Sequence, residues 1–401
     1  MKFNVKHTLA ACFVAITVQS VIINFPPLLF VTFENELGIS LAKIGTLIAI
    51  SFITQLCMDF TASKFPRIFN TRAMLVIGQI CASVGLFSIA LLPKIMPPYA
   101  GLIIGTVIGA FGSGIIEVLG APTIEACPIE NKNKVLSILH SFYCWGLVAT
   151  VILSTAFFYF FGTEHWEFLT CLWACIPAIN ALMFLKVPIY HTKQVQKSEK
   201  SDDNILRSFV FWALLGVMMC GGAAEQAMSQ WASSFAETGL GVSKTVGNLL
   251  GPCAFAVLMG IARILYAKYS TRINLSAFMI VSAILCAISY LVTALSPIPA
   301  ISLLGCAICG FAVGIMWPGT LLMATENVSS GGIKMFALLA LAGDIGCTVG
   351  PSSAGFIAQL FGHNLKISFL FSALFPAAMI VLILMMLKAT KKQIHSKEQE
   401  K

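Results

Sequence analysis

The sequence predicts an all-α membrane protein with twelve transmembrane helices, arranged as two six-helix pseudo-repeats. Three observations support this fold class. Of the 401 residues, 58% are hydrophobic and only 10% are charged, whereas soluble domains carry about 25% charged residues. Apolar segments long enough to span a bilayer, which takes about 20 residues, recur along the whole chain. The fourth and the tenth of these segments also share a pattern of residues.

Each apolar segment is predicted to be a helix, because an open-ended segment satisfies its backbone hydrogen bonds within lipid only as a helix. Proline and glycine inside the segments, such as Pro122 and Pro318, therefore indicate kinks and close packing. The first apolar run lacks a small-residue cleavage site, so we expect an uncleaved span rather than a signal peptide. The predicted spans are residues 8–33, 41–62, 73–92, 98–124, 135–161, 166–187, 208–236, 243–267, 273–295, 298–325, 333–361 and 367–388.

The distribution of lysine and arginine over the loops predicts the orientation of the chain. If the N-terminus lies in the cytoplasm, only four of the 25 basic residues lie on the outer side, namely Lys43, Lys94, Lys244 and Lys366. The positive-inside rule strongly favours this arrangement. We therefore expect a multi-pass protein of the cell (inner or plasma) membrane with both termini in the cytoplasm.

The longest polar stretch separates two predicted bundles. We expect an N-terminal six-helix bundle at 1–187, a cytoplasmic linker at 188–206, a C-terminal six-helix bundle at 207–388 and a basic cytoplasmic tail at 389–401. The tail suits the anionic headgroups of membrane lipid. Residues 105–117 align with residues 305–317, and five pairs are identical: Gly105/Gly305, Ile108/Ile308, Phe111/Phe311, Gly114/Gly314 and Ile115/Ile315. Two parallel six-helix repeats hold a substrate site between them near the bilayer midplane.

Glu117 is a charged residue within a long apolar stretch of the fourth segment, which carries no further charge until Glu125. An ionisable side chain in lipid costs roughly 2.5–3.5 kcal/mol on insertion scales, so such a residue usually faces a polar cavity. Desolvation disfavours the charged form of a carboxyl, which would let Glu117 bind a proton on one side of the membrane and release it on the other. We interpret Glu117 as a proton-coupling residue. The alternative is a neutral, hydrogen-bonded structural carboxyl.

Four segments carry motifs that resemble a known family: GIIEVLGAPTIEA in the fourth, HSFYCWG in the fifth, AAEQAMSQWASSFAE in the seventh and GFAVGIMWPGTLL in the tenth. They resemble the major facilitator superfamily, and within it the fucose–galactose–glucose:proton symporter (fucose-permease-like) branch. This resemblance implies a twelve-helix transporter of sugars with protons. The chain departs from the branch in its first segment, where Asn24 stands in place of an acid that the branch commonly has. Asn24 can hydrogen-bond a ligand but cannot carry a proton, which leaves sugar specificity and coupling stoichiometry open.

The superfamily's loop signature between the second and third spans is only partly kept. Asp59, Arg67 and Arg72 remain in MDFTASKFPRIFNTR. Arg263 is a candidate for a residue of the same signature repeated in the second half. We expect these residues to form a cytoplasmic latch that gates one conformation. The alternative is ordinary charge of the positive-inside kind.

Two further residues are candidates for proton coupling. His140 lies in the fifth segment near the predicted level of Glu117, and histidine titrates near neutrality. The two could exchange a proton, although a lone histidine in a helix also serves as a packing donor. Asp344 lies among small residues of the eleventh segment, where it is either a second proton site or a polar group that packs helices.

Substrate binding is predicted for residues on several segments. Glu225 and Gln226 are adjacent in the seventh segment, and Gln230 shares a helix face with Gln226. We expect these residues to bind ligand or to gate access. Trp145 and Trp317 lie well inside their segments, and with Asn24 they offer the mix of flat apolar faces and hydrogen bonds that small-molecule pockets use. The alternatives are inter-helix hydrogen bonds for the polar residues and interfacial anchoring for the tryptophans.

Motifs of enzymes, such as GxxxxGK[ST], HExxH and GxSxG, are missing from the sequence. We therefore expect no enzyme, no cofactor and no metal site, and the scattered basic residues favour no nucleic-acid partner. The predicted function is secondary active transport, a proton-coupled symport of a sugar-like small polar solute by alternating access. The expected partners are that solute, a proton or sodium ion, and lipid, with the protein a monomer. Two alternatives are a proton-coupled exporter of amphipathic drugs or metabolites, and a non-transporting membrane receptor or lipid-handling protein.

Overall fold

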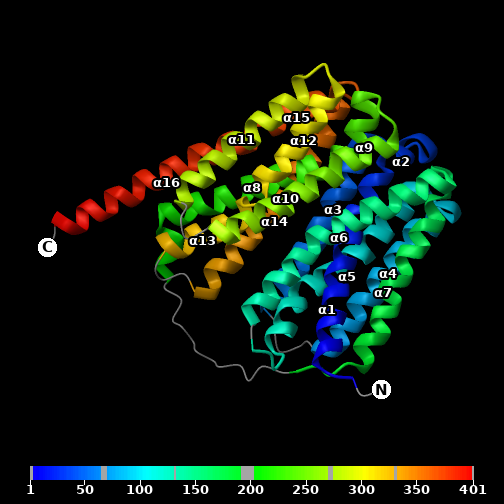
Figure 1. Cartoon of the computed structure of the whole chain (residues 1–401), viewed down its shortest axis with the longest axis horizontal. Helices are drawn as coiled ribbons and strands as arrows, with labels where there is room; N and C mark the ends of the chain where they lie inside the picture. Colours follow the sequence, from blue (N-terminus) through cyan, green and yellow to red (C-terminus); the bar gives the residue numbers. More distant parts are fainter. Residues whose placement is uncertain are drawn as a thin grey trace. The chain divides into compact units, whose positions relative to one another are not determined.

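The computed structural model describes residues 3–64, 70–130, 132–190, 203–269, 274–328 and 332–399. This described part is helical throughout its regular elements and contains no β-strand. Twelve of its helical segments are long and apolar enough to cross a membrane, and Figure 1 shows the helices coloured along the chain. The predicted all-α membrane fold with twelve spans is confirmed, while the cytoplasmic location of the termini stays a prediction.

Nine elements build the first six spans. They are α1 (Val5–Asn24), η1 (Pro26–Leu29), α2 (Phe30–Leu37), α3 (Leu41–Lys64), α4 (Thr71–Ile95), α5 (Pro98–Glu125), α6 (Lys132–Phe161), η2 (Thr163–His165) and α7 (Trp166–Lys186). The first span is broken after Asn24, where Pro26 and Pro27 begin a short 3₁₀ turn. Proline lacks an N–H and ends regular helix, so the break follows directly from the sequence.

The remaining spans contain more interruptions. Their elements are η3 (Asp203–Arg207), α8 (Phe209–Ser234), η4 (Phe235–Gly239), α9 (Lys244–Asn248), η5 (Leu249–Cys253), α10 (Ala254–Tyr269), α11 (Leu275–Leu295), α12 (Pro299–Val313), α13 (Met316–Asn327), α14 (Gly332–Leu360), α15 (Leu365–Ser372) and α16 (Leu374–Gln399). The elements η4 and η5 are π-helical. The tenth span is divided into α12 and α13, and α16 continues as helix into the predicted tail.

Contacts divide the chain into two compact units. The first comprises Met1–Val195 and Ala232–Val257, and the second comprises Gln196–Trp231 and Leu258–Lys401. The segment Ala232–Val257, which joins the seventh and eighth spans, therefore belongs to the first unit. The compact units and the predicted six-helix halves differ at this segment, and the division of the chain at 188–206 stays a prediction.

Close helix packing in the first unit depends on glycine. A Cβ added to Gly85 on α4 would overlap the backbone of Gly109 on α5, and one added to Gly112 would lie 2.6 Å from the backbone nitrogen of Ala82. Small residues of this kind let two membrane helices approach with their backbones nearly in contact. This packing fixes α5, the helix that carries Glu117, against α4.

The shared pattern of the fourth and tenth spans has a structural counterpart. An added Cβ on Gly105 would lie 2.8 Å from the backbone nitrogen of Ile89 on α4, and one on Gly305 would lie 3.0 Å from that of Thr293 on α11. Each glycine thus packs against the helix that precedes its own span. The aligned residues play the same packing role in their respective units.

A second aligned pair, Gly114 and Gly314, also makes equivalent contacts in the two units. A Cβ on Gly114 would lie 2.8 Å from Cβ of Met58 on α3, and one on Gly314 would lie 2.8 Å from the carbonyl oxygen of Met259 on α10. Both glycines therefore pack against the helix two spans earlier in the chain. These equivalent contacts favour an internal repeat over chance similarity of apolar sequence.

Candidate functional site

Glu117 lies on α5 and faces α1. The Nε2 group of Gln19 donates a hydrogen bond to Oε2 of Glu117 at 2.9 Å. Gln19 is only 6% exposed, whereas the Glu117 side chain is exposed and its neighbour Ile116 is fully buried. The carboxyl of Glu117 is therefore more exposed than its apolar neighbours in the sequence suggest. A helix turns by about 100° per residue, so apolar neighbours in the sequence occupy other faces of α5 and do not enclose Glu117.

Asn24 is the last residue of α1, directly before the proline break of the first span. Its Nδ2 group donates to the carbonyl oxygen of Ser20 at 2.9 Å and to the hydroxyl of Tyr143 on α6 at 3.3 Å. The Ser20 hydroxyl donates in turn to the Tyr143 carbonyl oxygen at 3.0 Å. Asn24 is buried. The predicted ligand-binding amide thus links α1 to α6, and its role toward a substrate stays a prediction.

Two of the predicted site residues, Trp145 and His140, belong to α6. The Trp145 side chain is 45% exposed, so it is not enclosed by the helices of its own unit. The side chain of His140 lies outside the described part of the structure, and its proposed proton exchange with Glu117 therefore stays a prediction.

In the second unit, three predicted polar side chains of α8 contact one another. The Nε2 group of Gln230 donates to Oε1 of Gln226 at 3.3 Å, and Nε2 of Gln226 lies 3.5 Å from Oε1 of Glu225. Both glutamines are buried, and Glu225 is half-buried. The structure brings together these three predicted binding residues as a short hydrogen-bonded chain.

Trp317 and Asp344 also lie near one another in the second unit. The indole of Trp317 covers Gly343 on α14 so closely that an added Cβ on this glycine would overlap the ring. Asp344 is the next residue, and it is half-buried, with its carbonyl oxygen accepting from Thr348 at 2.9 Å. The predicted aromatic and acidic candidates of the tenth and eleventh spans are therefore adjacent.

The predicted latch residues have partners that the sequence did not indicate. The Nη1 group of Arg72 donates to the carbonyl oxygens of Phe184 and Leu185 at 2.8 and 2.9 Å, which satisfies carbonyls that the end of α7 leaves without helical donors. The Nε group of Arg263 donates to the carbonyl oxygen of Gly314 at 3.1 Å. Arg67 and the side chain of Asp59 lie outside the described residues. A gating role for these four residues stays a prediction.

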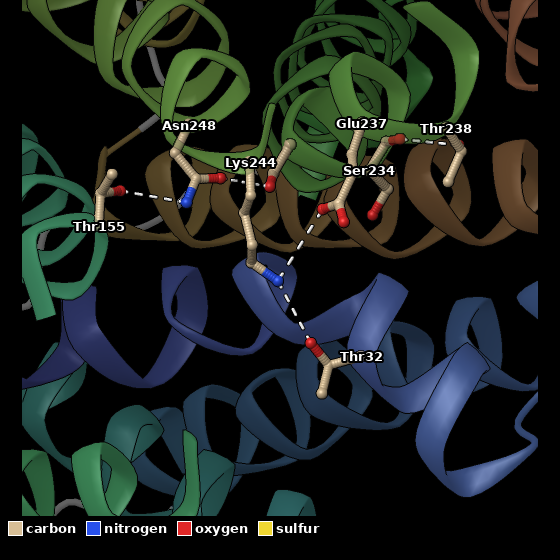
Figure 2. A network of polar contacts seen from close by, with 8 residues as sticks. Thr32, Thr155, Ser234, Glu237, Thr238, Lys244 and Asn248 are labelled. Atoms are coloured by element: carbon tan, nitrogen blue, oxygen red, sulfur yellow. Dashed lines mark hydrogen bonds and ion pairs between the residues drawn. The ribbon is translucent and has the colours of Figure 1, made fainter. Parts of the chain in front are cut away.

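A polar cluster that sequence reasoning missed surrounds Lys244 at the start of α9 (Figure 2). Its Nζ lies 3.2 Å from the hydroxyl of Thr32 on α2, 3.9 Å from Oε2 of Glu237 on η4, and 5.4 Å from the ring centre of Phe158 on α6. The Lys244 side chain is only 13% exposed. We call these four residues the Lys244 cluster.

A second set of contacts lies beside the Lys244 cluster. The Nδ2 group of Asn248 donates to the hydroxyl of Thr155 on α6 at 3.1 Å, and the Ser233 hydroxyl donates to Oδ1 of Asn248 at 2.5 Å. Asn248, Thr155 and Ser233 are all buried. Together with the Lys244 cluster, they hold the segment Ala232–Val257 on the rest of the first unit (Figure 2). This role of Lys244 is not apparent from the sequence, where Lys244 resembles an ordinary loop charge.

Comparison with protein families identifies the chain. The family model of the Major Facilitator Superfamily matches residues 8–333 and 240–401. The chain belongs to this superfamily. The resemblance inferred from four sequence motifs is thereby confirmed at the level of the superfamily, whose members are transporters and not enzymes. No curated protein sequence matches the chain.

Solved structures of major facilitators share the fold of the chain. A D-xylose–proton symporter is 16% identical with a TM-score of 0.71, over 92% of this chain and 96% of that one. The nucleoside transporter NupG is 14% identical with a TM-score of 0.72, over 96% of this chain and 98% of that one. The E. coli fucose:proton symporter FucP is 15% identical with a TM-score of 0.59, over 95% of this chain and 97% of that one. At such identities the likeness concerns the fold, and the solutes of these proteins differ.

The Lys244 cluster of this major facilitator allows a stability prediction. Replacing Lys244 by methionine keeps the apolar stem but leaves the Glu237 carboxylate and the Thr32 hydroxyl without their cationic partner. Removing one partner of a largely buried polar contact costs on the order of 1–3 kcal/mol, so we expect a clear fall in the thermal unfolding temperature of the detergent-purified protein.

The matched control is Lys94→Met. Lys94 also forms an ion pair, with Glu167 at 3.0 Å, but its side chain is 57% exposed. Exposed ion pairs contribute about 0–1 kcal/mol, so this variant should unfold close to the wild-type temperature. Equal unfolding temperatures for the two variants would contradict a structural role for the Lys244 cluster.

Proposed function

We propose that this protein is a proton-coupled symporter of a small, sugar-like polar solute, in which Glu117 binds the coupled proton. The observation that carries the proposal is the hydrogen bond between Gln19 and Glu117, which joins an exposed carboxyl to a buried amide inside two candidate membrane spans. An ionisable group within a membrane span is costly and is retained mainly for function. Membership of a transporter superfamily makes proton handling a natural use for it.

The amide of Gln19 suits both protonation states of Glu117. It donates from Nε2 to the carboxylate, and after an amide flip its Oε1 accepts from the protonated carboxyl. Neither state then leaves a buried polar group without a partner. A lysine or arginine in this position would instead favour the carboxylate alone.

Coupling follows from the change of charge. When Glu117 is ionised, a carrier that closes around it must bury a charge, which is strongly unfavourable. Protonation removes that charge, so the loaded carrier can reorient and present its site to the other side. Release of the proton on that side completes the transport of solute with a proton.

The polar solute class is supported by side chains of the second unit. The amides of Gln226 and Gln230 offer donors and acceptors of hydrogen bonds, and the indole of Trp317 offers a flat apolar face. Sugars require this combination of groups. Two of the solved major facilitators with the same fold are named as sugar–proton symporters.

The solute class can be tested by ligand-induced thermal stabilisation. D-xylose, L-fucose, uridine and tetraphenylphosphonium would each be added to the purified protein at an acidic and at a neutral pH. We expect stabilisation by a monosaccharide, with a larger effect at acidic pH, followed by uptake of that sugar into proteoliposomes. Stabilisation by uridine alone would contradict the sugar class, and stabilisation by the amphipathic cation alone would favour an exporter.

A further inference from the structure

The segment Ala232–Val257, which we call the strap, changes its anchorage at the end of α8. Trp231, the residue directly before the strap, belongs to the second unit, and its Nε1 group donates to the carbonyl oxygen of Pro351 on α14 at 2.8 Å. The strap itself belongs to the first unit, and the chain returns to the second unit at Leu258. The seventh and eighth spans therefore each have one part in either unit.

The two legs of the strap are joined to each other. The Ser233 hydroxyl on the first leg donates to Oδ1 of Asn248 on the second leg. A Cβ added to Gly247 would lie 2.9 Å from Cβ of Ala236, so the legs are also in close van der Waals contact. We therefore expect the strap to move as one body when it moves.

Two polar side chains of the strap dock it on the first unit. Nζ of Lys244 lies 3.2 Å from the hydroxyl of Thr32 on α2 and 5.4 Å from the ring centre of Phe158 on α6. Nδ2 of Asn248 donates to the hydroxyl of Thr155, also on α6, at 3.1 Å. Hydrogen bonds of this kind exchange with water at a modest net cost, so they suit a contact that forms and breaks.

The docked strap leaves polar atoms with unmet hydrogen-bonding capacity. Oε2 of Glu237 is buried and lies 3.9 Å from Nζ of Lys244, which is too long for a hydrogen bond. Within the described part of the chain, neither this oxygen nor the buried hydroxyl of Ser234 has a hydrogen-bond partner. Release would expose both groups to water, and this gain offsets part of the free energy of docking.

The legs of the strap also depart from regular α-helix. The first leg contains η4 and the second contains η5, both π-helical, and Pro252 lies inside η5. Prolines and π-helical turns are the usual places at which a helix bends. The strap can therefore change its inclination without requiring α8 and α10 to move as straight rods.

We propose that the strap docks reversibly on α2 and α6 and that Lys244 is the main residue that keeps it docked. Release breaks the contacts of Lys244 with Thr32 and of Asn248 with Thr155, and it exposes the ammonium group to water. Alternating access requires part of a carrier to open and close in turn, and the strap supplies one such movement. The inference goes beyond the proposed function, because it depends neither on Glu117 nor on a particular solute.

Lysine footprinting of the wild-type protein in detergent tests the release without any ligand. An N-hydroxysuccinimide ester of acetic acid modifies accessible amines, and mass spectrometry reports the rate at each lysine. N-ethylmaleimide reports in parallel on Cys12, which is fully buried in the core of the first unit. We expect Lys94, whose side chain is 57% exposed, to react quickly. Lys244, at 13%, should react more slowly but to completion while Cys12 stays unmodified.

A variant that leaves the Lys244 cluster intact tests whether the strap moves as one body. Thr155→Val removes the acceptor of Asn248, and modification of Lys244 should become about fivefold faster, the equivalent of a hydrogen bond of ~1 kcal/mol. Thr155→Ser keeps the hydroxyl and should retain the wild-type rate. The matched control is Thr150→Val, since Thr150 is buried on the same helix and donates to its own helix at Gly146. This control should not change the rate at Lys244.

Three results would overturn the inference. The first is modification of wild-type Lys244 that begins only together with modification of Cys12, because the strap would then leave by general unfolding. The second is an unchanged rate at Lys244 in Thr155→Val, and the third is an equal increase in Thr150→Val. If Thr155→Val exposes Cys12, the wild-type comparison decides alone. No solute or coupled proton is followed, so failure of the proposed function would not alter these results.

Discussion

Glu117→Gln is expected to abolish accumulation of the solute against its gradient while leaving exchange of labelled for unlabelled solute intact. Glutamine has the shape of glutamic acid and can still hydrogen-bond Gln19, but it cannot bind a proton. A pH difference of about one unit supports roughly tenfold accumulation in a one-proton symporter, since one unit corresponds to about 1.4 kcal/mol. Proteoliposomes containing the variant should therefore equilibrate the solute without concentrating it.

The control for this variant is Glu125→Gln. Glu125 is the last residue of the same helix and is exposed, and the exchange of one carboxyl for an amide is identical. This control should accumulate solute as the wild type does. Uphill uptake by Glu117→Gln at the wild-type level would exclude Glu117 as the coupling residue.

Of the glycine-to-alanine substitutions considered in the first unit, Gly85→Ala is expected to destabilise the protein most. The added Cβ would overlap the backbone of Gly109, which cannot move aside in the way that a flexible side chain can. Overpacking typically costs on the order of 1–3 kcal/mol, and here α4 and α5 must separate. We expect a lower thermal unfolding temperature and a lower yield of monodisperse protein in detergent.

The matched control lies in the same contact. At Gly109, an added Cβ would meet its nearest atoms, in Ile22 and Gly85, at 3.7 and 3.8 Å, which is ordinary van der Waals contact. Gly109→Ala should therefore unfold near the wild-type temperature. A Gly109→Ala variant that is as unstable as Gly85→Ala would show that α4 and α5 do not pack in the described register.

The fold was largely predictable because bilayer thickness and backbone chemistry leave few solutions for long apolar segments. Twelve spans follow from composition and segment length alone, and the interruptions at Pro26 and Pro318 follow from proline chemistry. Pro122 and Pro351 show the limit of that rule, since both lie inside continuous helices, α5 and α14. Proline permits a helix break at its position, and the packing of the neighbouring helices determines whether the break occurs.

The candidate site was less predictable, because it depends on which face of a helix each side chain occupies. Gln19 is a polar residue in an apolar first segment, but nothing in the sequence shows that it faces Glu117 and donates a hydrogen bond to it. Arg263 resembles a loop charge in the sequence, but it reaches a carbonyl that Pro318 leaves without a donor.

The Lys244 cluster illustrates a different limit. Its members come from four elements, of which α2 and α6 are far in the sequence from η4 and α9, and none of the residues is unusual by itself. In the sequence, Lys244 is one of the few basic residues assigned to the outer side. Nothing there distinguishes it from an exposed loop charge, although the structure places it in a buried contact. Only the packing of the segment Ala232–Val257 onto α2 and α6 brings these side chains together.

The most direct test of proton-coupled transport is to measure proton movement itself. Wild-type protein would be reconstituted into vesicles that contain a pH-sensitive dye, with no pH difference imposed, and the stabilising sugar would be added outside. We predict that entry of the sugar acidifies the vesicle interior, and that Glu117→Gln vesicles take up the sugar without acidification. Sugar entry into wild-type vesicles with no change of internal pH would contradict proton-coupled symport.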